Sequence, residues 1–262
     1  MKHYSHMLEL GSFSRSKLAE ALNCPDATAA TILQQYQKKG YIQRVRHDFY
    51  VVMSLESSQP LLSRYEIGSR LFPDACVSHH SAFEVFGCAN QVFYDTYVTS
   101  AHRFKDFTFD GVTYRRVAPK GKPNTQMVGN IKVTTLEQTV IDSIQAVERI
   151  GGLEELVRCL MMVPSLRSEK LLSVLASYEN GFLYQKAGYL LEQLNDALLL
   201  PSSFFNECAT HISLANRYLT QARDGYVYHE KWRLYAPINL DKVVDKGGVI
   251  KRSTAWSIEE TF

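Results

Sequence analysis

A short polar surface is predicted on one helix near the start of the chain. Between residues 26 and 39 the apolar side chains recur at helical spacing, which predicts a helix with one buried face. That face would carry Ala29, Ile32, Leu33 and Tyr36. The opposite face would carry Thr28, Thr31, Gln34, Gln35 and Lys38. Side chains of these types can reach base edges in the major groove of DNA, so this face is the first candidate contact surface.

A second helix is predicted immediately before the polar one. It begins at Ser14, whose hydroxyl can cap it, and Phe13 is expected to pack against Leu18. Asn23-Cys24-Pro25 then breaks this helix. Two helices joined by so short a turn are typical of the helix-turn-helix motif, whose second helix enters the major groove.

Two β-rich runs follow and predict a β-hairpin, or wing. They are residues 41–45 and 49–52, with Arg46-His47-Asp48 as the turn. Residues 1–52 contain seven basic and four acidic side chains, so the positive charge of the chain, +2 overall, is concentrated at its start. Cations on a wing and free donors at a helix start favour contact with the DNA backbone or the minor groove. The side chains predicted to make such contacts are Ser14, Ser16, Lys17, Arg44, Arg46 and His47.

Two other interpretations of this region remain open. A polar helix face can simply be solvated, and a winged helix can dock a protein instead of DNA. The local excess of positive charge favours DNA. Over the whole chain, 29 Lys and Arg against 27 Asp and Glu exclude a uniformly basic nucleic-acid coat and an acidic disordered chain.

The sequence lacks the motifs of several enzyme classes. No Asp or Glu is followed two residues later by Lys, the pattern expected of a restriction-endonuclease-type metal site. A glycine-rich phosphate loop and a Gly-x-Ser-x-Gly nucleophile turn are also missing. We therefore predict that the protein is not an enzyme, with no catalytic residue, no bound metal and no cofactor.

The adjacent histidines His79 and His80 are the remaining candidates for catalysis. Neighbours on a helix point about 100° apart, so the two cannot readily share one metal ion. We predict a structural role, with one ring buried and hydrogen-bonded, while a nuclease that uses either histidine remains an alternative. A second basic cluster, Arg115-Arg116 with Lys120-Gly121-Lys122, is predicted to be solvated surface that could also extend a nucleic-acid footprint or meet an acidic partner.

Beyond residue 60 the patterns predict strands followed by helices. This order lacks the strict alternation of a doubly wound sheet and indicates an α+β fold. Ser81 with Glu84, and Thr134 with Glu137, have capping-box spacing, so a helix is expected to begin at each pair. The predicted strands are 92–100, 107–109, 112–117, 130–133, 226–228 and 232–235, and the predicted helices are 61–71, 77–87, 134–150, 153–162, 168–178 and 182–200.

Four segments in this order resemble the AbiEi family of bacterial antitoxins and transcriptional regulators. They are the wing strand Asp-Phe-Tyr-Val-Val at 48–52, Val-Ser-His-His-Ser-Ala-Phe-Glu at 77–84, Tyr-Val-Thr-Ser at 97–100 and Val-Thr-Thr-Leu-Glu-Gln-Thr-Val-Ile-Asp at 133–142. The wing tip departs from the family pattern, since His47-Asp48 stands where a glycine often precedes the aromatic residue. The resemblance implies a non-enzymatic protein whose N-terminal domain binds DNA and represses its own operon. It also implies a C-terminal domain that antagonises a nucleotidyltransferase toxin encoded beside it.

The sequence therefore predicts a cytoplasmic autorepressor and antitoxin that binds double-stranded operator DNA with inverted repeats. Residues 1–53 would form the winged helix-turn-helix domain, 54–60 a linker, 61–252 an antitoxin-type α+β domain and 253–262 a polar tail. The five scattered cysteines indicate reduced thiols, and no apolar run is long enough to span a membrane. The alternative is a winged-helix regulator whose C-terminal domain senses a ligand and has no toxin partner.

Overall fold

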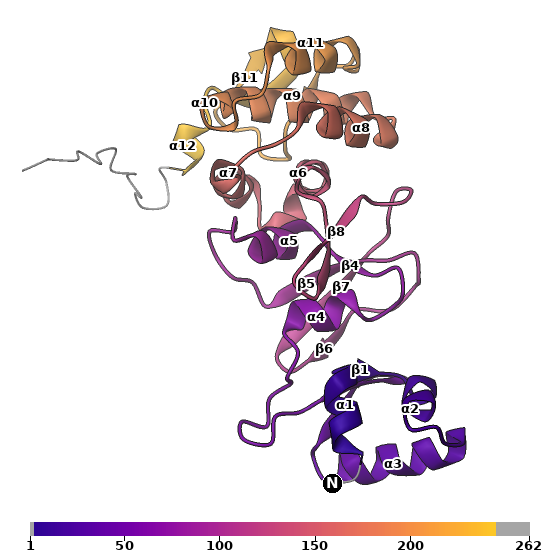
Figure 1. The fold of residues 1–262 in the computed structure, drawn as a ribbon. Coiled ribbons are helices and arrows are strands. Elements are labelled where there is room, and N and C mark those ends of the chain that lie inside the picture. The colour runs from indigo at the N-terminus through magenta and orange to yellow at the C-terminus, as the bar shows by residue number, and fades with distance from the viewer. Residues whose placement is uncertain (1–2, 245–262) are drawn as a thin grey trace, which may run out of the picture.

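The computed structural model describes residues 3–244, and the tail predicted at 253–262 lies outside them. The described elements form three groups along the chain: N-terminal helices with a small sheet, a central six-stranded sheet, and a C-terminal set of helices (Figure 1). The architecture is mixed α and β, which confirms the predicted α+β class at this level.

The N-terminal group packs three helices on a three-stranded antiparallel sheet of order β1-β3-β2. Its elements are α1 (Tyr4–Leu10), β1 (Ser12–Phe13), α2 (Arg15–Ala21), α3 (Asp26–Lys38), β2 (Ile42–Arg46) and β3 (Phe49–Val52). Phe13 and Leu18, the predicted packing pair, are both fully buried in its core. The four apolar side chains predicted to face inward on α3 are also buried, which confirms the helical periodicity.

The central group is built on a mixed sheet of order β6-β7-β5-β4-β9-β8. Strands β5 and β7 are parallel, as are β4 and β9, and the other neighbours are antiparallel. Asp110 and Gly111, which join β6 to β7, both have positive φ, as a two-residue hairpin turn of type I′ requires. The elements are α4 (Arg64–Ser69), β4 (Cys76–Val77), α5 (His79–Phe86), β5 (Asp95–Thr99), β6 (Phe107–Phe109), β7 (Val112–Val117), β8 (Thr125–Val128) and β9 (Ile131–Thr134).

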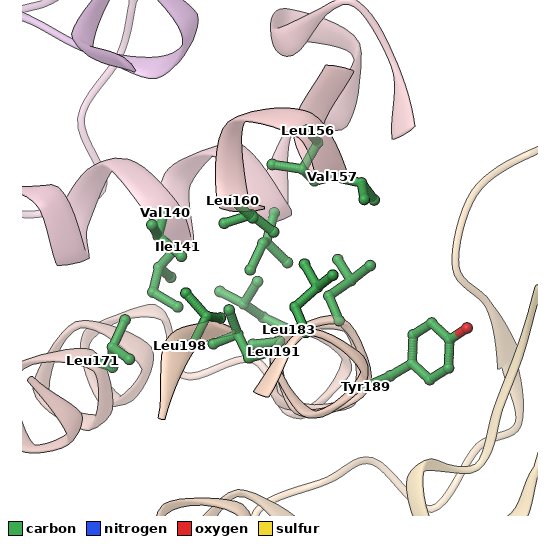
Figure 2. Close-up of a cluster of buried hydrophobic side chains, with 14 of the residues drawn as sticks. Val140, Ile141, Leu156, Val157, Leu160, Leu171, Leu183, Tyr189, Leu191 and Leu198 are labelled. Atoms are coloured by element: carbon green, nitrogen blue, oxygen red, sulfur yellow. The ribbon is translucent and has the colours of Figure 1, made fainter. Parts of the chain in front are cut away.

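The C-terminal group holds the largest apolar core of the described chain. Figure 2 shows its aliphatic side chains, such as Ile141, Leu160, Leu171 and Leu191, converging from neighbouring helices. A short sheet of order β10-β12-β11 packs beside the helices. The elements are α6 (Leu136–Gln145), η1 (Val147–Ile150), α7 (Leu153–Met162), α8 (Ser168–Tyr178), α9 (Gly181–Gln193), α10 (Asn195–Leu198), α11 (Ser202–Thr210), β10 (Arg217–Tyr218), β11 (Tyr226–His229), η2 (Glu230–Trp232), β12 (Leu234–Pro237) and α12 (Asp241–Val244).

Both predicted capping boxes in the central region are wrong. Helix α5 already begins at His79, so Ser81 lies inside it, and the Ser81 hydroxyl instead hydrogen-bonds to the backbone of β5. Helix α6 is capped by Thr135, which accepts a hydrogen bond from the Gln138 backbone N–H, because Thr134 is still part of β9. Capping-box spacing thus missed the N-cap of α5, Ser78, by three residues and that of α6 by one.

Other boundaries differ where tertiary packing interrupts a periodic segment. The helix predicted at 182–200 is divided into α9 and α10 at Leu194, and the one at 134–150 changes to a 3-10 helix after Ala146. Strand β8, strand β10 and helix α11 were not predicted. β8 and β10 are largely exposed edge strands without the alternation on which strand prediction depends.

The hairpin β2–β3 packs against the central group. Val45 and Phe49 belong to the same buried cluster as Ile67, Leu71 and Tyr114. The predicted linker, residues 54–60, is a compact loop whose ends are joined by backbone hydrogen bonds. The N-terminal and central groups therefore share a hydrophobic contact across this hairpin in addition to the covalent connection.

Candidate nucleic-acid interface

The polar side chains predicted on α3 form one exposed face. Helix α3 lies at the end of the molecule farthest from the C-terminal helices (Figure 1). A helix of 13 residues is about 20 Å long, enough to lie along a stretch of major groove. The Thr31 hydroxyl donates to the Ala27 carbonyl at 3.1 Å, so it retains only its acceptor capacity for a ligand. The exposed residues of this face are Thr28, Thr31, Gln34, Gln35 and Lys38.

The start of α2 is already engaged with protein groups. The Ser14 hydroxyl accepts from the Lys17 backbone N–H at 3.3 Å, which confirms Ser14 as the N-cap, and it lies 2.9 Å from the Ser16 hydroxyl. The Asp48 carboxylate, at the hairpin turn, accepts from the Arg15 backbone N–H at 2.9 Å. Asp48 thus occupies one of the free donors that would attract phosphate. Arg15 and Lys17 are both exposed, but Arg15 pairs with Asp26 at 2.8 Å, so Lys17 is the cation of this segment without an ion pair in residues 3–244.

The hairpin divides its predicted contact residues between two surfaces. Arg44 and His47 are exposed. Arg46 is partly buried: its guanidinium lies 4.1 Å from the centroid of the Phe72 ring and donates to the Leu71 carbonyl. Arg46 therefore contacts the central group and is separated from the exposed set on α3, Arg44 and His47.

The second basic cluster is largely neutralised by its surroundings. Arg115 pairs with Asp95 at 2.6 Å and with Asp106 at 3.4 Å. Arg116 donates to the backbone carbonyls of the 100–102 segment. Lys120 donates to the Tyr178 carbonyl. These contacts leave Lys122 as the exposed cation of the cluster without a described partner in residues 3–244.

His80 lies at the centre of a buried ionic network. Its ring nitrogens are 3.0 Å from Glu84 and 3.1 Å from Glu155, and its side chain is fully buried. Burial alone would lower the pKa of His80, but the hydrogen bonds and charges of the two carboxylates outweigh it and raise the pKa. Arg64 completes the network through a 2.5 Å ion pair with Glu84. The arrangement joins α4, α5 and α7, which favours the structural role predicted for this histidine.

The same network contains a group with metal-ligand chemistry. Ligand atoms of His80, Glu155 and Cys159 lie within 4.8 Å of one another. The Cys159 thiol donates to Glu155 at 3.6 Å, and burial followed by the charge of Glu155 raises its pKa. A metal requires a thiolate and a neutral imidazole, whereas these surroundings favour a protonated thiol and an imidazolium. The donor set therefore does not fit a metal, and we assign it none.

A buried carboxylate lies between α6 and α8. One oxygen of Asp142, Oδ1, accepts from the Tyr178 hydroxyl at 2.6 Å and from the Gln138 amide at 2.7 Å. Burial raises the pKa of Asp142 to about 6, although these two hydrogen bonds and the charge of Arg149 oppose the rise. An ionised carboxylate is thus held in this interior at a cost in stability near neutral pH.

Asp142→Asn should stabilise the protein at neutral pH. The asparagine Oδ1 can accept the same two hydrogen bonds, and no charge remains to be desolvated. Because the folded-state pKa is about 6 and the ordinary value is 3.8, wild-type stability falls as the pH rises between these values. We expect a gain on the order of 2–3 kcal/mol at about pH 8 that disappears near pH 4. Urea unfolding of both proteins across this range measures the difference, with Asp196→Asn on exposed α10 as the control; an unchanged stability at about pH 8 would contradict it.

The sequence matches no protein-family model and no curated protein. Among solved structures, the Rv2827c protein from Mycobacterium tuberculosis is similar, with a TM-score of 0.62 and 13% sequence identity. The match covers 90% of this chain and 89% of that one. At this identity the similarity shows a shared fold over nearly the whole chain. No helix within residues 3–244 combines the length and apolar character needed to cross a membrane.

Proposed function

We propose that this protein is a DNA-binding transcriptional autorepressor and antitoxin, with residues 1–53 acting as a winged helix-turn-helix domain. The exposed polar face of α3 carries the proposal, because it is amphipathic, accessible along its length and placed at one end of the molecule. In this proposal, α3 enters the major groove of an inverted-repeat operator and Lys17, Arg44 and His47 contact its backbone. Arg46 has no part in it, because its guanidinium contacts Phe72.

The antitoxin half of the proposal rests on the resemblance to the AbiEi family. The motif at 77–84 forms the junction of β4 and α5, and the motif at 133–142 forms that of β9 and α6. Most of these residues are buried, as expected of scaffold segments. A nucleotidyltransferase encoded in the adjacent reading frame, whose toxicity is relieved by co-expression of this chain, would support antagonism. An adjacent reading frame that encodes no such toxin, or a toxin whose toxicity this chain does not relieve, would overturn this half.

A double variant tests the DNA assignment. Lys38 and Arg44 are exposed and have no ion pair within the described chain, so both can neutralise phosphates. Lys38→Ala/Arg44→Ala should weaken binding to the protein's own upstream DNA and flatten the log–log salt dependence by about 1.8, or about 0.9 for each contact. Fluorescence anisotropy at several salt concentrations measures both quantities.

The matched control removes the same amount of charge elsewhere. Lys105→Ala/Lys170→Ala replaces two exposed lysines, in the loop before β6 and on α8. The control should bind DNA with the wild-type slope. Equal effects of the two double variants would show a general charge effect, and full affinity of the Lys38/Arg44 variant would reject the interface.

A ligand-sensing regulator without a toxin partner is the second candidate function. It is favoured by a polar cavity that lies between the central sheet and the C-terminal helices, far from α3. The adjacent reading frame distinguishes the two candidates, because only the first requires a toxin gene there.

A further inference from the structure

A cavity of about 150 Å³ lies where the central sheet meets helices α6 and α8. Strands β5 and β7 run parallel beside each other, and their last residues, Thr99 and Val117, both reach the wall. The opposite wall is formed by side chains of α6, η1 and α8, including Asp142, Arg149 and Tyr178. The cavity is therefore assembled from segments far apart in the sequence and is lined by groups of both charges.

Two cations line this cavity, and the ammonium of Lys120 already donates to the Tyr178 carbonyl, so the free cationic donors are those of the Arg149 guanidinium. This guanidinium lies 3.5 Å from Nε2 of His79 and forms no ion pair with a carboxylate in residues 3–244. Burial, with a smaller contribution from Arg149, lowers the pKa of His79 to about 3, so this imidazole is neutral and accepts from the guanidinium. A guanidinium has five N–H donors in a planar fork, and most of those of Arg149 have no acceptor within the described protein.

The acceptor side consists of Asp142 and Gln145. Both protein hydrogen bonds to the Asp142 carboxylate go to Oδ1, so Oδ2 has no partner among the described residues. Oε1 of Gln145 is buried and likewise has no hydrogen-bond partner there. A buried acceptor without a partner, such as Oε1 of Gln145, is unusual in native proteins. Together with Oδ2 of Asp142 and the free donors of Arg149, it points to a ligand that carries both an anionic group and a group of several donors.

We propose that this cavity binds a small α-amino acid. Its carboxylate would lie on the Arg149 guanidinium, which matches carboxylate geometry with two parallel donors. Its ammonium would donate to Asp142 and Gln145, whose free acceptors are otherwise unsatisfied. The volume limits the ligand, since a cavity of about 150 Å³ accommodates a molecule of roughly benzene size, about six non-hydrogen atoms. L-alanine and L-serine have that size.

The charges of the site select a zwitterion over a simple anion. Lys120 is held by the carbonyl and the ring of Tyr178, so Arg149 and Asp142 are the two charges left open to a ligand, one of each sign, and a zwitterion pairs both. An inorganic phosphate would approach the Asp142 carboxylate with its own negative charge, and a hydroxy acid would replace the three ammonium donors by one hydroxyl. This inference rests on the cavity alone, so it stands or fails independently of DNA binding and toxin antagonism.

Isothermal titration calorimetry of the full chain tests the ligand class. L-alanine and L-serine are the expected ligands, and L-lactate and inorganic phosphate are the comparisons. We expect either amino acid to bind at least about 10-fold more tightly than L-lactate, which has the size and carboxylate of L-alanine but no ammonium. Tighter binding of L-lactate or phosphate, or no heat from either amino acid up to millimolar concentration, would overturn the proposal.

Two variants test the named side chains. Asp142→Asn and Arg149→Met should each weaken amino-acid binding at least about 10-fold. Asp142→Asn is expected to be more stable than the wild type, so its loss of binding cannot arise from unfolding. The controls Asp196→Asn and Arg103→Met change exposed residues that do not line the cavity, and both proteins should bind the amino acid normally. Wild-type affinity for the amino acid in both cavity variants would show that it binds outside this cavity and would overturn the proposal.

Discussion

A Glu84→Gln variant is expected to be about 3–5 kcal/mol less stable than the wild type. The side chain of Glu84 is 3% exposed, accepts hydrogen bonds from three groups and lies within ion-pair distance of His80. Oε2 receives the Arg64 guanidinium and the Tyr65 hydroxyl, each at 2.5 Å. Oε1 lies 2.8 Å from the Phe93 backbone N–H and 3.0 Å from His80. The amide has nearly the same shape, so the change leaves no cavity, but its NH₂ group must face donors on one side and Arg64 remains a largely buried cation without a counter-ion.

The pH dependence of this difference identifies its electrostatic origin. Burial would raise the pKa of Glu84, but hydrogen bonds from His80, Tyr65 and the Phe93 N–H outweigh it and hold the pKa below 4.5. A carboxylate whose pKa is lowered on folding contributes stability above its unfolded pKa and loses it as the pH falls through the folded value. The gap between wild type and Glu84→Gln should therefore be full at neutral pH and narrow in acid.

Chemical denaturation at several pH values measures this gap. Glu207→Gln is the matched control. It makes the same chemical change on an exposed helix surface, where Glu207 pairs with His211. Exposed pairs of this kind contribute about 0–1 kcal/mol. A Glu84→Gln variant no less stable than the control would show that the network contributes nothing to the fold.

The second large effect concerns sequence recognition by α3. Gln34→Ala/Gln35→Ala should lower affinity for the protein's own upstream duplex roughly 100-fold, since each bidentate base contact contributes about 1–3 kcal/mol of discrimination. Affinity for a scrambled duplex of equal length should change little, because non-specific binding depends on cations. Both side chains are exposed, so the substitutions leave the core of the N-terminal group unchanged.

Competition binding with the two duplexes measures the specificity ratio. Gln126→Ala/Gln193→Ala, on exposed positions of β8 and α9, is the matched control and should retain the wild-type ratio. If the α3 variant loses the same affinity on both duplexes, its glutamines contact DNA without reading sequence. If it loses none, this face of α3 is not the interface.

Local patterns were sufficient where one segment buries its own face. The inward side of α3, the N-cap at Ser14 and the turn at Asp110-Gly111 were all predictable, because helical period, capping and positive φ are properties of a few neighbouring residues. The helices at 153–162 and 168–178 and the strands at 107–109 and 112–117 have their predicted bounds for the same reason.

The partners of charged and buried polar side chains were not predictable in this way. Arg46 has the charge and the hairpin position expected of a DNA contact. Packing of the hairpin on the central group nevertheless directs its guanidinium to the Phe72 ring. His80 and Glu155 are separated by 75 residues, and no local pattern connects them.

The sequence by itself determined which face of α3 is polar, where the main helices and strands run, and that the fold combines helices with strands. Only the tertiary structure decided which cations remain exposed and how Asp142, Arg149 and the ends of β5 and β7 enclose one polar cavity. The physical reason is one of range. Periodicity and capping act over one or two helical turns, whereas ion pairs and cavities depend on strand order and helix packing, which bring distant residues together.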